Sequence, residues 1–166
     1  MRLLVLCLVL CLPLLAPAGT AAERVGVYDS RSVAIAYAGS PFMARVMTDL
    51  KDRHRRAKES GDGAAAARLE AEGKALQRKL HSQGFGTAPV DDLLAYIADR
   101  LPALMAEVGV GAIVSVWDEA GLARHTGAGR VDVTDALVEA FAPDERARRS
   151  AREIRNKPPA RRAAPP

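Results

Sequence analysis

The sequence predicts an α+β protein that is mostly helical, with a small antiparallel-containing β body, a projecting helical hairpin arm and a short C-terminal helix. Three observations support this prediction. Two stretches of about 18–20 residues carry apolar side chains at alternating steps of three and four, as helices with a narrow contact face do. Residues 24–29 and 112–118 read as short strands because they are rich in β-branched side chains. Residues 130–141, RVDVTDALVEAF, place a strand end directly before an amphipathic helix.

The N-terminal segment, residues 1–22, has the pattern of a secretory signal peptide. One arginine precedes an apolar run from Leu3 to Leu15, and small residues follow up to Ala22. The run is shorter than the roughly 20 residues that cross a bilayer as a helix. We therefore expect cleavage and a periplasmic or secreted protein, with an uncleaved anchor as the alternative.

The residue types of the mature chain argue against most kinds of active site. Both cysteines, Cys7 and Cys11, lie in the signal-like segment, so the mature chain has no disulfide and no thiolate ligand for a metal. The three histidines, His54, His81 and His125, stand apart in sequence, although the first two lie in opposite helices of the predicted hairpin and can approach each other. No serine sits in a GxSxG turn. We predict no catalytic residue, no metal and no cofactor, and we favour a non-enzymatic role.

The first strand ends in a cluster of polar residues. Asp29 or Ser30 can cap a short helix that stops at Gly39, and Ser40-Pro41 then begins the next helix. Tyr28, Asp29 and Arg31 lie at the carboxyl end of the strand, where ligand sites often form. The cluster has two interpretations: a cap with its ion-pair partner, or a small-molecule site.

The hairpin arm is predicted to span about residues 41–83. Its coiled-coil-like contact positions are Met43, Met47, Leu50, His54 and Ala57 in the first helix, and Ala66, Leu69, Gly73, Leu76 and Leu80 in the second. Methionine side chains adapt to irregular apolar surfaces. We therefore name Met43, Met47 and Leu50 as candidate partner-binding residues.

The segment after the hairpin is predicted to alternate between helix and strand. QGFGTAP, residues 83–89, is either a helix–helix corner in which Phe85 folds back onto the body, or a hinge or ligand loop. A third helix is expected over about 90–108, with a kink at Pro102 and an end at Gly109. LARHT, residues 122–126, is predicted to return as an antiparallel partner of the strand at 112–118.

The last predicted helix of the body follows Val131. Asp132 or Thr134 can cap it, and Val133, Leu137, Val138 and Phe141 share one apolar face.

Beyond Pro143, residues 144–166 contain eight Lys or Arg and three acidic residues, and the last part is rich in proline. We predict a disordered tail with two interpretations: a solvated segment that aids solubility, or a segment whose Arg148, Arg149 and Arg152 contact an anionic membrane surface. A nucleic-acid partner is not expected for an exported chain.

The order of these elements resembles the OmpH/Skp-like periplasmic family over about residues 24–142. The resemblance rests on the strand and helix in RVGVYDSRSVAIAYAGS, the hairpin, the strand AIVSVWDEAGLARH and the VDVTDALVEAF segment. It implies a short-armed homo-oligomer, a trimer in that family, in which a β-rich body assembles and hairpins contact unfolded client proteins or other envelope components. The implied function is chaperone-like binding of unfolded or envelope proteins, without enzymatic activity.

Two other functions are compatible with the sequence. A small exported enzyme or ligand-binding domain would be centred on Tyr28, Asp29 and Arg31, with the QGFGTAP corner closing over it. An envelope structural protein would be tethered by the basic tail at 144–166.

Overall fold

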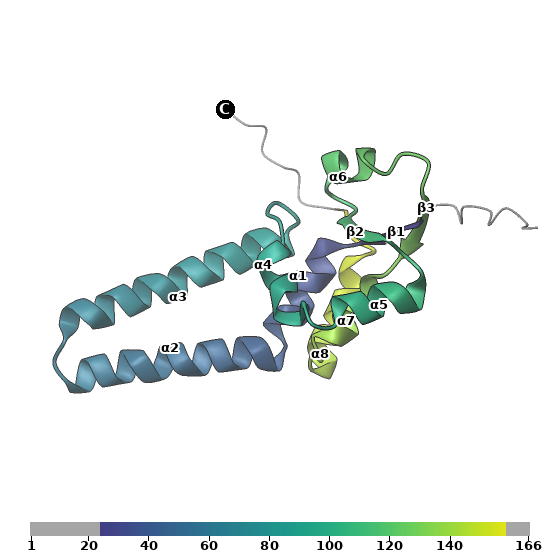
Figure 1. The fold of residues 1–166 in the computed structure, drawn as a ribbon. Helices are drawn as coiled ribbons and strands as arrows, with labels where there is room; N and C mark the ends of the chain where they lie inside the picture. Colours follow the sequence, from purple (N-terminus) through teal and green to yellow (C-terminus); the bar gives the residue numbers. More distant parts are fainter. Residues whose placement is uncertain (1–23, 159–166) are drawn as a thin grey trace, which may run out of the picture.

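The computed structural model describes residues 24–158, so the predicted signal peptide and the last eight residues lie outside it. The chain is α+β and mostly helical, with a three-stranded sheet and a projecting hairpin (Figure 1). The elements are β1 (Arg24–Tyr28), α1 (Ser30–Ala38), α2 (Pro41–Glu59), α3 (Gly63–Gly84), α4 (Asp91–Leu94), the 3-10 helix η1 (Ala95–Ile97), α5 (Leu101–Val108), β2 (Ala112–Ser115), α6 (Glu119–Ala123), β3 (Gly129–Asp132), α7 (Thr134–Ala140) and α8 (Glu145–Ile154).

The sheet is parallel throughout, with strand order β2-β1-β3. The predicted antiparallel pairing is therefore wrong, and so is the predicted strand at 122–126. Residues from Glu119 to Ala123 form helix α6 instead, because Asp118 caps it by accepting a hydrogen bond from the Gly121 N–H at 2.9 Å. This helix carries the chain back across the sheet, so that β3 enters in the same direction as β1.

The two faces of the sheet are covered unequally. Tyr28, Ile113 and Val131 point into the main core, which the larger helices enclose. Val25 and Val114 lie on the other face by strand alternation, and both are buried. Figure 1 shows α6 on the side of the sheet opposite to α5 and α7.

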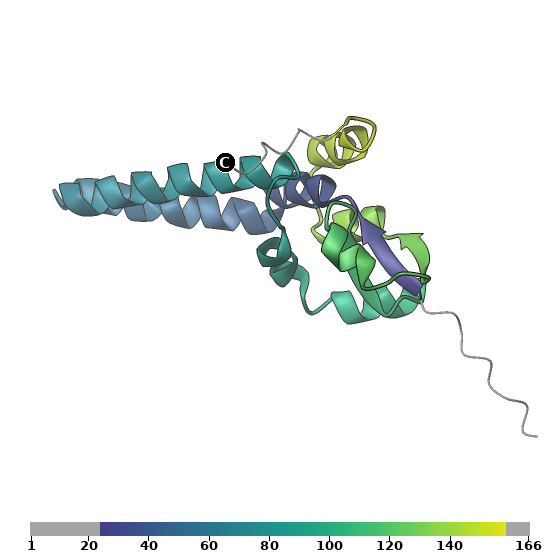
Figure 2. The same cartoon turned by 90° about the horizontal axis from the view of Figure 1, so that it is seen from above.

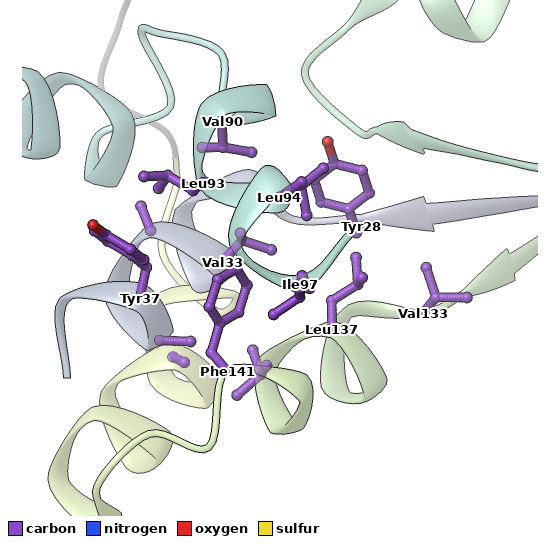
Figure 3. Packing of buried hydrophobic residues seen from close by; sticks show 14 residues of the cluster. Tyr28, Val33, Tyr37, Val90, Leu93, Leu94, Ile97, Val133, Leu137 and Phe141 are labelled. Carbon is purple, nitrogen blue, oxygen red and sulfur yellow. The ribbon is translucent and has the colours of Figure 1, made fainter. Parts of the chain in front are cut away.

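The main core lies where α1, α4 and α7 meet (Figure 3). Tyr37, Ile97, Leu137 and Phe141 are its largest fully buried apolar side chains, and the rings of Tyr37 and Phe141 pack edge to face with centroids 6.1 Å apart. These four side chains come from three segments that are far apart in sequence. The closing helix thus joins the N-terminal helix to the segment that follows the hairpin.

The capping predicted for the VDVTD segment is confirmed. The Asp132 carboxylate accepts a hydrogen bond from the Thr134 N–H at 2.9 Å at the start of α7. Thr134 also has a long-range role, because its hydroxyl oxygen accepts a hydrogen bond from the Asp29 N–H at 3.1 Å. This hydrogen bond links the start of α7 to the residue that follows β1, the strand that pairs with β3.

The prediction of one continuous third helix over 90–108 is wrong. The segment forms α4 and η1, turns, and only then forms α5 from Leu101. Pro102 lies in the first turn of α5, where its missing N–H has no helical partner to lose, so it begins a helix and does not kink one. The predicted end at Gly109 is confirmed, with φ of +67° in the left-handed region that favours glycine.

The disordered tail predicted over 144–166 is also wrong for its first part, because residues from Glu145 to Ile154 form α8. The Asp144 carboxylate caps this helix by accepting a hydrogen bond from the Ala147 N–H at 2.7 Å. Ala151 is buried, and the Ser32 hydroxyl donates to its carbonyl oxygen at 2.7 Å. The high charge count hid the small apolar stripe of Ala147, Ala151 and Ile154, which has helical spacing.

The hairpin is confirmed, with α2 and α3 projecting from the body in both views (Figures 1 and 2). Ser40 and Asp62 cap the two helices, each accepting a hydrogen bond from an N–H of the first turn. Near the tip, Leu50, Ala57, Ala66 and Leu69 are buried against one another. Across residues 24–158, no helix combines the length and the apolar character that a bilayer span requires.

Candidate functional site

The first candidate region is an apolar groove at the base of the hairpin. It has a volume of about 810 Å³ and lies between α2 and α3. Met43 and Met47 line it from α2, and Leu76 and Leu80 line it from α3. Gly39 and Asp144 close the end nearest the body. We call this hollow the hairpin groove.

The groove exists because α2 and α3 diverge from the tip toward the body (Figure 1). At the tip side, Gly73 lets the helices approach, since a Cβ atom there would lie 3.3 Å from Leu50 Cδ2. At the base, α1 packs against both helices and holds them apart. Met47 and Leu76, which lie between these two levels, stay half-buried beside the open space.

The structure brings the three apolar candidate residues to this region. Met43 and Met47 line the hairpin groove, whereas Leu50 is buried in the tip cluster and lines a smaller hollow of about 180 Å³. Leu76 and Leu80, the α3 half of the groove, were not predicted as binding residues, because their heptad-like spacing indicates contact with α2 along the whole length of the hairpin. The glycine at position 73 was the available signal that the closest approach is local.

The second candidate region is the carboxyl end of the sheet, where four donor groups form hydrogen bonds to the Asp29 carboxylate. The donors are the Arg31 backbone N–H at 2.9 Å, Arg31 Nε at 3.0 Å, Arg31 Nη2 at 2.7 Å and Trp117 Nε1 at 3.1 Å. Arg31 Nη1 also donates to the Lys157 carbonyl oxygen at 3.0 Å. The prediction of Asp29 as a cap with Arg31 as its partner is confirmed.

A cavity of about 250 Å³ adjoins this ion pair. Parallel sheets often bind ligands at this edge, but most of the charged groups that line the cavity already have partners. Arg155 forms ion pairs with Asp132 and Asp135. Burial raises the pKa of Tyr28 to about 12, with a contribution from Asp91 and Asp118, so its phenol stays protonated near neutral pH. The contacts favour a structural role for this edge.

The QGFGTAP corner packs beside the Asp29–Arg31 ion pair, but its buried residue is Gln83 and not the predicted Phe85. A Cβ atom on Gly86 would lie 3.3 Å from Arg31 Cγ, so the loop passes close over that side chain. Phe85 is 59% exposed, and its predicted packing onto the body is wrong. Gln83 takes the inward position because its amide donates to the Pro89 carbonyl at 2.9 Å and to Asp92 at 2.7 Å.

The tail arginines, all in α8, differ in their contacts. Arg148 donates to Glu139 and to Glu145, each at 2.7 Å, and these hydrogen bonds raise its pKa. Arg149 lies 3.7 Å from Glu145, and Arg152 is exposed. Contact of these three residues with an anionic membrane stays a prediction.

The histidines of the hairpin are not paired with each other. His54 Nε2 lies 3.2 Å from Glu70 Oε1 on the facing helix, whereas the His81 ring lies 6.4 Å from the Phe85 ring. Within residues 24–158, no group of three or more His, Cys, Asp or Glu side chains is arranged to hold a metal ion.

The hydrogen bonds to Asp29 predict a pH dependence of stability. Burial alone would raise its pKa, but the bonds from Arg31 and Trp117 outweigh burial and hold the pKa below the usual value of 3.8. Because the folded pKa is lowered, this contribution is present above the unfolded pKa and is lost as the pH falls through the folded one. Urea midpoints measured from pH 7 down to pH 2 are expected to fall at the acid end, and less steeply for Asp29→Asn. Parallel curves for the two proteins would contradict this.

The order of elements agrees with the prediction only in outline, as a first strand, a helical hairpin, later strands and the helix α7; α6 lies where a strand was predicted, and α8 follows α7. The suggested relation to OmpH/Skp-like proteins stays a prediction that rests on this order and on the VDVTD segment. The chain matches no family model, no curated protein and no solved structure.

Proposed function

We propose that this protein is a non-enzymatic polypeptide-binding protein that receives an apolar segment of a partner chain in the hairpin groove. The observation that carries the proposal is the groove itself, an open apolar hollow of about 810 Å³ between two helices. Its size falls within the range of protein sites that enclose a ligand, roughly 300–1,000 Å³. An apolar surface left open to water on one chain commonly marks a binding site.

The side chains that line the groove suit a variable partner. Met43 and Met47 have unbranched, flexible side chains, which can repack around apolar groups of different shapes. Leu76 and Leu80 form the facing wall from α3. This arrangement, two helices with an apolar hollow between them, is the setting in which helix-in-groove recognition occurs.

The wider biological role is part of the same proposal. The signal-like N-terminus and the resemblance to OmpH/Skp-like proteins support an exported, chaperone-like protein that binds unfolded or envelope proteins. The projecting arm supports it as well, because the groove lies on an element that leaves the body (Figure 2). Assembly into a homo-oligomer through the sheet body, as a trimer in that family, belongs to the proposal too.

The two other functions have less support. A small-molecule site at Tyr28, Asp29 and Arg31 would need groups that are free to bind, but Asp29 and Arg31 bind each other with side chains that are 9% and 3% exposed. A membrane tether formed by the whole 144–166 segment is less favoured because its first part is helix α8, which packs against α1.

The groove makes a direct prediction for chaperone-like activity. The full chain is expected to suppress light scattering when an unfolded porin is diluted from urea. The double variant Met47→Ser and Leu76→Ser is expected to need at least about threefold more protein for the same suppression, because two apolar contacts are replaced by hydroxyls.

The control is Ala67→Ser with Ala71→Ser, which introduces the same two serines at exposed positions of α3 that do not line the groove. This control is expected to behave like the unchanged chain. A wild-type chain that leaves porin aggregation unaltered would overturn the proposed function. Equal loss of suppression in both double variants would show that the hairpin groove is not the binding site.

A further inference from the structure

We infer that the segment received by the hairpin groove is an acidic amphipathic helix, an inference that rests on the proposed function. The structure holds two kinds of evidence for this partner. The first is the charge that remains unpaired along the groove, and the second is the backbone chemistry of its two walls.

The acidic side chains of the groove are already engaged. Glu70, on the α3 wall, pairs with His54 across the hairpin at 3.2 Å. One carboxylate oxygen of Asp144, at the closed end, accepts a hydrogen bond from the Ala147 N–H at 2.7 Å and so caps α8. Both carboxylates keep their charge, but each already has a hydrogen-bond partner within this chain.

The cationic side chains of the groove are not engaged in this way. Lys74 lines the groove from α3, and Lys51 lines the smaller hollow that continues it beyond Glu70 and Gly73. Both lysines are exposed, and no carboxylate of residues 24–158 forms an ion pair with either. The charged groups along the groove and its continuation that lack a partner in residues 24–158 are thus two ammonium groups, which favour carboxylates on an incoming segment.

The charge of the whole arm acts in the same direction. Residues 41–84 contain ten Lys or Arg and six Asp or Glu, whereas residues 24–40 and 85–158 together contain eleven and thirteen. The arm is therefore net positive and the rest of the described chain slightly negative, so an acidic segment is attracted more to the arm than to the body. Such a field steers a charged partner toward one part of a molecule before contact is made.

The walls of the groove favour a helical partner. Both walls are α-helices, α2 and α3, whose backbone N–H and C=O groups bond within each helix. An extended segment in the groove would find no backbone ladder to pair with, and those of its backbone polar groups that face the walls would lie unpaired against apolar side chains. A helix satisfies these groups internally. From Met43 to His54 the groove and its continuation span about 16 Å at 1.5 Å per residue, which is roughly three helical turns.

The test compares two labelled peptides that have the same leucine and methionine face. One carries Glu and Asp on its polar face, and the other carries Lys and Arg. Binding to the full chain is measured by fluorescence anisotropy at low salt. The acidic peptide is expected to bind about tenfold more tightly, an effect that two partly exposed ion pairs and the field of the arm can supply. The difference is expected to shrink as salt is added.

Charge reversal at the groove provides the matched comparison. Lys51→Glu with Lys74→Glu is expected to abolish or invert the preference. Arg45→Glu with Arg56→Glu makes the same change on exposed positions of α2 that do not line the groove, and it is expected to preserve most of the preference. An acidic peptide with a proline at its centre is expected to bind at least about fivefold more weakly, because proline breaks the helix.

The outcomes separate the two proposals. If neither peptide binds, the proposed function fails, and the inference fails with it. If both peptides bind equally, or the Lys51 and Lys74 reversals change nothing, the inference on acidity is overturned while the polypeptide-binding function stands. If the proline peptide binds as well as its parent, the inference of a helical partner is overturned.

Discussion

Truncation of the chain after Pro143 is expected to destabilise the fold by roughly 3–5 kcal/mol, although a charge count alone assigns this segment to a dispensable tail. The loss has identifiable sources. Ala151 is 1% exposed against α1, and Ser32 and Arg31 each donate a hydrogen bond to a carbonyl of the removed segment. Arg148 also bridges to Glu139 on the body. Thermal unfolding followed by circular dichroism is expected to show a Tm lower by about 10 °C or more.

The control is truncation after Pro158, which keeps all of these contacts and removes only the last eight residues. We expect the loss to be confined to the longer truncation. Equal melting temperatures for the full chain and the chain ending at Pro143 would show that α8 contributes little to the fold. Single substitution of Ala151 by Glu offers an independent check, since it places a charge in the α8–α1 contact without shortening the chain.

Replacement of Asp29 by Ala is expected to cost roughly 3–5 kcal/mol, the range found when one member of a buried ion pair is removed. The Arg31 side chain is 3% exposed, so it would keep its charge without the carboxylate that three of its hydrogen bonds reach. The same change removes the cap of α1 and a partner of Trp117. The measurement is the free energy of unfolding from urea denaturation.

The matched control is Asp49→Ala, which removes one member of an exposed ion pair with Arg53 and is expected to cost less than about 1 kcal/mol. Asp29→Asn keeps a hydrogen-bond acceptor and is expected to fall between the two. A loss below about 1 kcal/mol for Asp29→Ala would mean that Arg31 finds other partners and that the pair is not central to the fold.

The parts of the fold that were predicted from sequence are those with local signals. The hairpin follows from apolar side chains at helical spacing, and Ser40-Pro41 marks its start by the chemistry of a helix N-terminus. The closing helix α7 was predicted because the capping residues and the apolar face agree within one short segment. Asp29 and Arg31 were correctly paired because they are two positions apart.

The features that were not predicted depend on distant contacts. The direction of β3 depends on the path taken by α6, and LARHT alone fits a strand or a helix equally well. Gln83 is buried and Phe85 exposed because Pro89 and Asp92 supply hydrogen-bond acceptors that no local pattern shows. The groove was only half predicted because its α3 wall becomes a binding surface only when α1 separates the two helices at their base.

The central position of β1 sets the order in which the chain can fold as it is synthesised. This strand is the first described element to leave the ribosome, yet both of its partners, β2 and β3, come after the hairpin. The Asp29 N–H meets its acceptor on a residue 105 positions later. Contacts at such separation form slowly, whereas the hairpin has mostly local contacts and can form early. The hairpin arm can therefore form in the nascent chain before the body does. The body is complete only after β3, α7 and α8, which are synthesised last, have been added.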